Sequence, residues 1–582
     1  MKVYTELEKS LIIFGIGIGV SSWIIEIGGG LKVIKLGVFL AAVVLLLSIT
    51  FSVFEIVRFF KSHLRSKWII VICAIFVLYA VDIFSPFIEI DALSYHLYVP
   101  KIFLREGHIF TDKFTPQTFF PLLVENLFTL GLSINNIFIC KGIILLIGFF
   151  LIIGVINFID VFFDIRISPF PALILLSIPG IWHNSVICYN DIPLTFFEFL
   201  SFYFFLKWVV NFHRRDFYLS AVFSGFSINT KYLGLFLLPL LIGSMIIFLI
   251  KEKRSSVSGV LKYVSTFLII TLVVGGGIYA RNYLQTGNPF FPYLYQIFGP
   301  YGWRSDVGSS VGMGKSLIRY LEGFWNLSIF PDKFGGGANQ LGVLFLAFLG
   351  FIPLGWRYLT YSEKKVIKII LFFCLSYYTL WFIVVQNLRF FYIVGILLCI
   401  ITGVFIAKVW KKLNKITQIL CTVCIGVNFL LSFYYSANKL KGVLAIDKEK
   451  YLSSLDRTYR ISKWINTHIP SHEKILICGE PGIYRFSPYV IRELPFRYLT
   501  QYHKENLLWK DMRKMLRGKG FSFVLIRLWY NPQGKLISFY PKDTVPYIIL
   551  TKKPQDAKCI YSCKFIDKEL GTFKYYVFKI NG

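Results

Sequence analysis

Two acidic residues stand close together directly after a long apolar stretch, in the segment EIDALSYHLYVPK. Glu89 and Asp91 are followed by Tyr95, His96 and, further along, Lys101. A carboxylate that is partly desolvated at a membrane edge can act as a general base, because burial raises its pKa while a nearby cation keeps it ionised. The alternative is that both acids are solvated loop residues and that His96 is a hydrogen-bonded helix residue.

A second acidic position lies in HNSVICYNDIPLTFF, where Asn190 and Asp191 precede another apolar stretch. Such a pair can bind substrate or take part in catalysis. It can equally be a helix start, because an acid in the first turn interacts favourably with the helix dipole and Pro193 is tolerated there. The residues alone do not decide between the two.

Three cations interrupt or flank the apolar stretches. Lys231, followed by Tyr232, stands inside a stretch that is otherwise apolar, where a charge is costly unless it is paired or wet. Arg281 and Asn282 end a later stretch, and Arg389 lies between two more. An arginine can bind a phosphate through two parallel hydrogen bonds. The alternatives are structural. The lysine side chain would extend to the membrane–water interface, and the arginines would anchor their helices at that interface beside aromatic rings.

The composition predicts the elements that position these residues. The chain has 582 residues, of which 56% are hydrophobic and 16% charged, whereas about 25% are charged in typical soluble domains. Apolar stretches of about 20 residues recur, and each can cross the hydrocarbon core as a helix. The net charge of +30 resides largely in short loops and in the C-terminal tail. We therefore predict an all-α polytopic membrane protein and no nucleic-acid partner.

We expect about 13 membrane-spanning helices. A further apolar segment, 119–132, is too short to cross comfortably and is predicted to be interfacial or re-entrant. The expected spans are 10–27, 36–57, 68–86, 137–160, 169–186, 191–210, 218–231, 233–250, 263–281, 341–356, 366–386, 390–408 and 416–436.

The connections set the predicted orientation. If the N-terminus is cytoplasmic, five basic connections lie on the cytoplasmic side, in accord with the positive-inside rule: 57–67, 211–216, 251–254, 356–365 and 408–415. The two acidic and three cationic positions then all face outward, as do the loops 87–136 and 282–340.

The tail differs in character from the rest of the chain. KILICGEP and FSFVLIRLW are typical of buried strands, and they alternate with helical patterns. We predict a transmembrane domain over 1–436 and an extracytoplasmic α/β domain over 437–582.

Five segments in this order resemble the GT-C superfamily of integral-membrane glycosyltransferases, over about residues 68–410. Within it, the closest resemblance is to the protein mannosyltransferase-like group, which includes the bacterial lipid A aminoarabinose transferase. The segments are DALSYHLYVPK, NDIPLTFF, INTKYLGLF, RNYLQTGNPFFP and QNLRFF.

The resemblance implies an enzyme of the cell (inner) membrane. Such enzymes transfer a sugar from a polyprenyl-phosphate donor to a lipid, glycan or protein acceptor on the extracytoplasmic face. It implies that Asp91 is the general base, that Glu89 supports it or shares the role, and that Asp191 is the second acidic position. This chain departs from the common pattern, because it has Glu-Ile-Asp in place of adjacent acids and two additional spans before the acidic loop. Which acid is the base therefore stays open.

The resemblance also implies that Lys231, Arg281 and Arg389 hold the lipid phosphate and that His96 orients a substrate. We predict further substrate-binding residues at Tyr95, Lys101, Asn190, Tyr232 and Asn282. The sequence contains no compact set of metal ligands, so we predict no obligatory metal or other cofactor, with a divalent cation as the alternative.

Two other functions remain as alternatives. One is an oligosaccharide polymerase or ligase that uses a lipid-diphosphate donor. The other is a transporter or flippase, a class with charges near the bilayer midplane and often with repeated halves. The charges here gather at one predicted face and no repeat is visible, which favours the transferase. The expected partners are the donor, the acceptor and membrane lipids.

Overall fold

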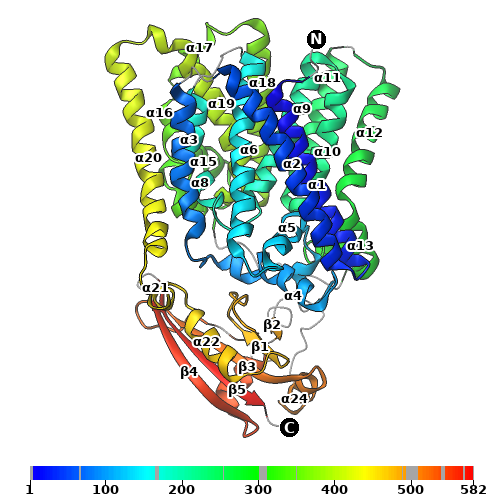
Figure 1. Ribbon diagram of the computed structural model, residues 1–582, viewed down its shortest axis with the longest axis vertical. Helices are drawn as coiled ribbons and strands as arrows, with labels where there is room; N and C mark the ends of the chain where they lie inside the picture. Colours follow the sequence, from blue (N-terminus) through cyan, green and yellow to red (C-terminus); the bar gives the residue numbers. More distant parts are fainter. Residues whose placement is uncertain are drawn as a thin grey trace. The chain divides into compact units, whose positions relative to one another are not determined.

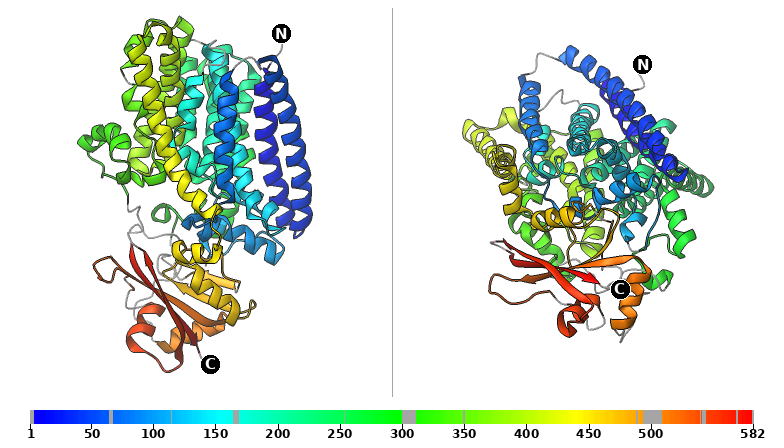
Figure 2. Two further views of the ribbon diagram at one scale, coloured as in Figure 1. Left: turned by 60° about the vertical axis from the view of Figure 1, so that its left-hand side comes forward. Right: turned by 60° about the horizontal axis from the view of Figure 1, so that its bottom comes forward.

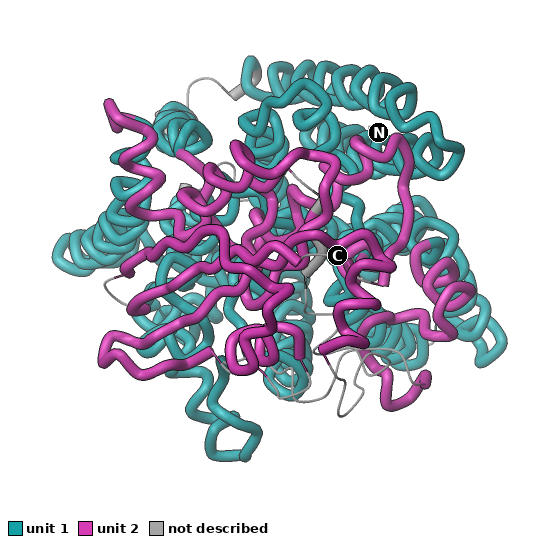
Figure 3. Tube along the Cα trace, turned by 90° about the horizontal axis from the view of Figure 1, so that it is seen from below, with its two compact units in different colours: residues 1–85, 121–277, 309–443 teal, residues 86–120, 278–308, 444–582 magenta. Residues whose placement is uncertain are grey.

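The computed structural model describes residues 4–63, 67–113, 115–163, 169–252, 254–299, 311–348, 350–487, 489–492, 509–538, 540, 544–567 and 570–580. Two compact units make up the chain, and each contains segments that are distant in sequence (Figure 3). Unit 1 comprises Met1–Ser85, Pro121–Gly277 and Ser309–Val443. Unit 2 comprises Pro86–Phe120, Ile278–Gly308 and Leu444–Gly582.

Unit 1 is a bundle of long helices that run side by side (Figures 1 and 2). Within the described residues, nine helical stretches are long and apolar enough to cross a membrane. The predicted all-α multi-pass membrane domain is therefore confirmed. The helices of these stretches are α1 (Glu6–Gly30), α2 (Ile34–His63), α6 (Ile137–Phe163), α9 (Asp191–Asn211), α11 (Leu237–Lys251), α12 (Val257–Gly275), α18 (Tyr361–Val384), α19 (Tyr392–Val409) and α20 (Lys415–Val443).

The other four expected spans are shorter or broken, so the expected count is not confirmed. One stretch breaks before Pro179, which lacks the N–H that a continuous helix would need there. The segment 119–132, expected not to cross, contains a helix of only ten residues, α5 (Leu123–Leu132). The elements in the four spans are α3 (Lys67–Ala80) with η1 (Val81–Phe84), α7 (Pro169–Leu176) with α8 (Pro179–Asn184), α10 (Arg214–Thr230), and α16 (Leu344–Ala347) with α17 (Phe351–Trp356).

Helix α9 lies at the centre of unit 1. It packs against α6, α10 and α19, and the whole of its apolar window is buried. Near its C-terminal end Lys207 forms an ion pair with Glu8 of α1, and Tyr203 donates a hydrogen bond to the same carboxylate at 2.6 Å. Because a buried charge is costly without a partner, this contact fixes α1 against α9. The C-terminal half of α9 is thereby held by the core of the bundle.

Unit 2 contains a five-stranded mixed sheet in the order β2-β1-β3-β5-β4. Strand β1 pairs in parallel with β2 and β3, while β5 pairs antiparallel with β3 and β4. The predicted C-terminal α/β fold is thus present. The elements are α21 (Lys448–Leu455), α22 (Tyr459–His468), β1 (Lys474–Cys478), β2 (Tyr489–Arg492), α24 (Trp509–Gly518), β3 (Phe521–Tyr530), α25 (Val545–Lys552), β4 (Ala557–Asp567) and β5 (Gly571–Ile580).

The same unit includes parts of both predicted outer loops, so its composition does not follow chain order. Its C-terminal part begins after α20, which continues to Val443. The division into 1–436 and 437–582 stays a prediction. The loop elements are η2 (Ala92–His96), α4 (Tyr98–Glu106), η3 (Pro116–Phe119), α13 (Gly277–Thr286) and α14 (Tyr295–Phe298).

A glycine substitution tests the close packing of α1 on α2. A Cβ added at Gly28 would come within 2.9 Å of the Gly37 Cα atom, whereas one added at Gly30 would meet nothing within 4 Å. We expect Gly28→Ala to lower the free energy of unfolding by about 1–3 kcal/mol, because backbone atoms would have to separate. Thermal unfolding of the purified chain in detergent measures this effect. Gly30→Ala is the matched control, and equal midpoints for the two variants would contradict the packing.

Candidate active site

Asp191 is the first residue of α9, as the helix-start interpretation predicted. Its carboxylate is almost fully buried, with 1% of the side chain exposed, and its backbone carbonyl accepts a hydrogen bond from the Thr195 hydroxyl at 2.8 Å. The positive end of the helix dipole favours an acid at this position. Asn190 precedes it without capping the helix through its side chain. The helix start therefore places the carboxylate, and its partners decide what it can do.

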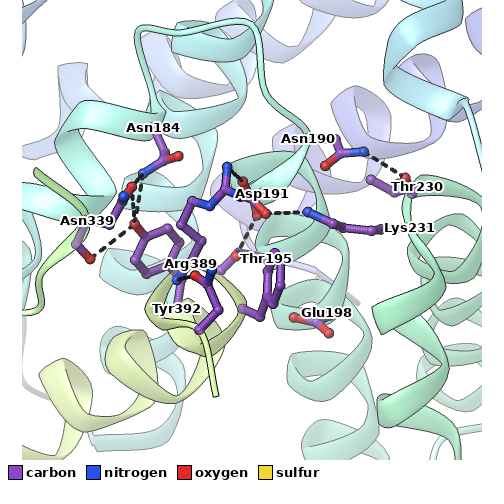
Figure 4. Close-up of polar contacts among 12 residues, drawn as sticks. Asn184, Asn190, Asp191, Thr195, Glu198, Thr230, Lys231, Asn339, Arg389 and Tyr392 are labelled. Carbon is purple, nitrogen blue, oxygen red and sulfur yellow. Dashed lines mark hydrogen bonds and ion pairs between the residues drawn. The ribbon is translucent and has the colours of Figure 1, made fainter. Parts of the chain in front are cut away.

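Two cations converge on this carboxylate (Figure 4). Lys231 donates a hydrogen bond from Nζ to Asp191 Oδ1 at 2.6 Å, and Arg389 Nη1 lies 3.7 Å from Asp191 Oδ2. The lysine side chain is 17% exposed and the arginine side chain 18%. We call these three residues the Asp191 cluster. Its carboxylate is buried while both cations remain partly accessible, so the cluster can still accept an anion.

Both cations lie where a helix ends and the backbone turns. Lys231 is in an extended conformation between α10 and the short helix η4 (Tyr232–Phe236), which begins at Tyr232. The predicted helix break is therefore present, and the lysine is also paired. Arg389 lies in the turn η7 (Leu388–Phe391), where the Asn387 side chain accepts its backbone N–H at 3.1 Å.

Aromatic rings flank both cations. The Nζ atom of Lys231 lies 4.4 Å from the centroid of the Phe390 ring, and the Arg389 guanidinium lies 5.0 Å from that of Tyr189. Cation–π contacts of this kind hold a cation in place while leaving its hydrogen-bond donors available. The rings therefore help to keep both cations at the cluster.

Sequence reasoning missed several polar residues around the cluster. Asn190, which was predicted, donates from Nδ2 to Glu125 Oε1 of α5 at 3.0 Å. Glu198, seven residues after Asp191 on α9, accepts a hydrogen bond from Tyr377 at 3.3 Å. An acid in the middle of an apolar helix is a functional candidate, because placing its charge inside a membrane costs free energy. The sequence alone could therefore have indicated Glu198. Positions seven apart also share a helix face.

A second polar group lies on the other side of Arg389 (Figure 4). Asn184 Nδ2 donates to the Tyr392 hydroxyl at 2.8 Å and to Asn339 Oδ1 at 3.0 Å. These three residues come from α8, α19 and the turn η6 (Gly337–Asn339). Neutral side chains so far apart along the chain carry no sequence signal that could have joined them.

The acidic segment lies in unit 2. Glu89 Oε2 accepts the Ile88 N–H at 3.1 Å, and Asp91 immediately precedes η2. The rings of Tyr95 and His96 lie with their centroids 3.9 Å apart.

The loop that follows β1 holds this acidic segment in place. The backbone N–H groups of Ile483 and Tyr484 both donate to the Leu93 carbonyl, at 3.0 and 2.8 Å. Lys101 donates from Nζ to the carbonyls of Tyr484 and Phe486, at 2.7 and 2.9 Å. Burial, followed by the nearby charge of Arg105, lowers the pKa of Lys101 to about 8. Lys101 thus binds protein backbone in this structure, and its role towards a substrate stays a prediction.

Arg281 and Asn282 also contact backbone within unit 2. Arg281 Nη2 donates to the Thr118 carbonyl at 3.0 Å, and Asn282 Nδ2 donates to the Phe119 carbonyl at 2.8 Å. Both contacts hold η3. The proposed phosphate role of Arg281 stays a prediction.

The structure therefore divides the predicted residues between its two units. Unit 1 brings Asn190, Asp191, Lys231 and Arg389 together, with Tyr232 beside Lys231 in sequence. No group of three His, Cys, Asp or Glu side chains that could hold a metal occurs among the described residues, and metal independence stays a prediction. The predicted residues in unit 2 are Glu89, Asp91, Tyr95, His96, Lys101, Arg281 and Asn282.

The chain is similar to known proteins in sequence and in structure. Residues 116–278 match the family model described as dolichyl-phosphate-mannose-protein mannosyltransferase, and this range contains both Asp191 and Lys231. No curated protein matches the sequence significantly. The structure of ArnT from Cupriavidus metallidurans in the apo state matches with a TM-score of 0.55 at 11% identity, over 88% of this chain and 97% of that one. The chain has the GT-C fold.

A second structure supports the same GT-C fold. It is ArnT from Cupriavidus metallidurans bound to undecaprenyl phosphate, with a TM-score of 0.55 at 12% identity, over 88% of this chain and 98% of that one. An oligosaccharyltransferase from Archaeoglobus fulgidus, tethered to an acceptor peptide, gives a TM-score of 0.49 at 13% identity, over 83% of this chain and 75% of that one. The fold assignment rests on ArnT, and the resemblance to the GT-C superfamily is confirmed.

A buried acid anchors the loop that holds the acidic segment. Glu480 accepts hydrogen bonds from the Tyr575 hydroxyl at 2.8 Å and from the Gly482 N–H at 2.9 Å. The guanidinium groups of Arg457 and Arg527 each lie 3.3 Å from its carboxylate. Burial by itself would raise the pKa of Glu480, but the charges of the two arginines, together with the hydrogen bonds from Gly482 and Tyr575, lower that pKa below its ordinary value.

This anchor predicts a pH dependence. Because the pKa of Glu480 is lower in the folded chain, its contribution to stability is fully present above the ordinary value of 4.5 and is lost as the pH falls through the folded value. We expect residues 474–487 to exchange backbone hydrogen faster at about pH 4 than at neutral pH, after correction for intrinsic rates. Hydrogen–deuterium exchange of the full chain measures this difference.

Glu480→Gln should raise exchange at neutral pH and reduce the difference between the two pH values. Glu449→Gln is the control, because Glu449 is 58% exposed and forms only a surface ion pair with Lys463. A pH difference that is unchanged in Glu480→Gln would show that this carboxylate does not anchor the loop.

Proposed function

We propose that this chain is a glycosyltransferase that moves a sugar from a polyprenyl-phosphate donor to a lipid, glycan or protein acceptor. The observation that carries the proposal is the Asp191 cluster, in which two partly accessible cations share one buried carboxylate. It lies in a chain with the GT-C fold, and ArnT, which has this fold, binds undecaprenyl phosphate. A lipid-linked phosphate is the anion that such a cluster suits best.

Lys231 and Arg389 are the proposed phosphate ligands. Negative charge grows on the phosphate of the sugar donor as its bond to the sugar breaks. N–H groups that are already in position therefore stabilise the transition state more than they stabilise the bound substrate. Arginine supplies parallel N–H groups for two phosphate oxygens, and lysine supplies a compact charge. Their partial exposure of 17% and 18% supports access by the lipid phosphate.

Asp191 has a positioning role in this proposal. Lys231 donates a hydrogen bond to its Oδ1 atom, and the Arg389 guanidinium lies 3.7 Å from its Oδ2 atom, so the carboxylate can hold both cations in place. It keeps both cations oriented when no phosphate is bound. Asn190, whose buried Oδ1 has no hydrogen-bond partner within the described part of the chain, is the proposed contact for a sugar hydroxyl.

The reaction is a direct displacement. The proposed base, Asp91 with Glu89 as the alternative, takes the proton of an acceptor hydroxyl. The acceptor oxygen forms a bond to the anomeric carbon of the sugar while the bond from that carbon to the phosphate oxygen breaks. The bonding electrons stay on the phosphate, which leaves as polyprenyl phosphate, and the configuration of the sugar is inverted.

We also propose the location of this chemistry. The reaction takes place on the extracytoplasmic face of the cell (inner) membrane, with the N-terminus in the cytoplasm. The basic connections between the apolar stretches support this orientation, because lysine and arginine accumulate in cytoplasmic loops.

A sugar-release assay tests the proposal. Purified protein in detergent receives a panel of polyprenyl-phosphate sugars together with lipid acceptors, and free polyprenyl phosphate is measured. We expect release by the wild type and a fall of about a hundredfold or more in Asp91→Asn, because the base is lost. Lys231→Met and Arg389→Gln should each reduce kcat/KM by about tenfold or more, because one ligand of the leaving phosphate is lost.

Controls separate these effects from unfolding. Glu322→Gln removes an exposed acid that pairs with Arg319 on the helix α15 (Leu317–Ile329), and its activity should equal that of the wild type. All variants are compared by thermal unfolding. If Asp91→Asn retains activity, Glu89 becomes the proposed base, and unchanged activity in both cation variants would refute the proposed phosphate site. Movement of lipid across the bilayer of reconstituted liposomes, without sugar release, would favour a flippase.

The proposed metal independence has its own test. The enzyme is dialysed against a chelator and assayed with and without added Mg²⁺ or Mn²⁺. Because the proposed charge stabilisation comes from Lys231 and Arg389, we expect release to persist in the chelator. Loss of activity that is restored by the added cation would identify a divalent-metal enzyme.

A further inference from the structure

A cavity of about 400 Å³ opens in unit 1 between α9, α11 and α18, away from the Asp191 cluster. Helix α11 packs against both of the other helices. Phe205 and Val209 line the cavity from α9, and they lie 14 and 18 residues after Asp191. At 1.5 Å per residue these intervals are about 21 and 27 Å along the helix. The cavity is therefore at the opposite end of α9 from the proposed phosphate site.

The charged residues that line the cavity, which we call its mouth, are mostly cationic. Four lysines and one glutamate line it, which gives a net charge of +3. Lys365 pairs with Glu252, with Nζ 2.9 Å from Oε1. The other three lysines, Lys251, Lys364 and Lys368, form no salt bridge with any residue that the structure describes. An uncompensated cationic mouth attracts an anion.

The walls of the cavity are apolar. Ile247 of α11 is 53% exposed and Phe372 of α18 is 50% exposed, and an exposed apolar side chain on a spanning helix faces hydrocarbon. Tyr361, the first residue of α18, is 87% exposed and lines the cavity beside the lysines of that helix. From Tyr361 to Phe372 the helix advances by about 16 Å, roughly half the hydrocarbon thickness. An aromatic ring at the mouth is typical of the interface between headgroups and hydrocarbon.

We propose that this cavity binds an anionic phospholipid. The headgroup phosphate contacts Lys251, Lys364 and Lys368, while one acyl chain lies along Ile247 and Phe372. A cationic mouth joined to an apolar wall matches the two parts of a phospholipid. A zwitterionic lipid would bring a cation of its own into a mouth that is already positive, so the charge favours a lipid with net negative charge. This site is independent of the proposed transferase activity.

Native mass spectrometry of the full chain tests the site. The protein, delipidated in detergent, is titrated with phosphatidylglycerol or with phosphatidylcholine of the same acyl chains. We expect wild-type protein to retain phosphatidylglycerol at least about fivefold more than phosphatidylcholine. The triple variant Lys251→Gln, Lys364→Gln, Lys368→Gln should lose this preference and bind phosphatidylcholine as the wild type does.

Two matched variants make the test specific. Changing Lys262, Lys411 and Lys415 to Gln removes three exposed lysines outside the cavity, and the preference should survive. Replacing the three cavity lysines by Arg keeps the charge and should also preserve it. Equal retention of both lipids by the wild type, or equal loss in the control triple variant, would overturn the proposal. So would displacement of the lipid by excess inorganic phosphate, which would identify a small-anion site.

Discussion

The requirement that a charge inside a membrane domain be paired or reach water constrains unit 1 throughout. At the start of α9 this requirement is met by Asp191 and Lys231. Asp191 is 1% exposed and Lys231 interrupts an apolar stretch, so each needs the other as a partner. At the other end of α9, Lys207 and Glu8 satisfy the same requirement across two helices. Pairing of this kind fixes the rotation of a helix as well as its position, since only one face carries the charge. The core of the bundle therefore determines where the Asp191 cluster lies.

Within the Asp191 cluster, the carboxylate and the cations differ in access to water. The carboxylate is enclosed, while both cations remain partly exposed and rest against aromatic rings. Enclosing all three groups would add the desolvation cost of two further charges. Partial exposure leaves donors for a further anion. This asymmetry is the physical basis for our proposal that the cluster binds phosphate.

In unit 2, the C-terminal part of the chain holds residues that lie hundreds of positions earlier in the sequence. Its loop after β1 binds the acidic segment through backbone groups, at Leu93 and through Lys101. Glu480 in turn holds that loop through Arg457 and Arg527. The conformation of the acidic segment thus depends on the folding of the sheet. The GT-C fold is retained at 11% identity to ArnT, as expected where packing and charge pairing, rather than particular residues, maintain an architecture.

The sequence by itself determined the class of the protein and most of the long helices, because apolar length and the spacing of basic loops are local properties of the chain. It also selected Asp191, Lys231 and Arg389, since charged residues stand out in apolar surroundings. Tertiary structure alone decided that these three meet, while Lys101, Arg281 and Asn282 bind backbone carbonyls. It also decided that the Asn184 side chain donates a hydrogen bond to the Tyr392 hydroxyl. Contacts between residues distant along the chain depend on how helices pack, and hydropathy and spacing do not record that.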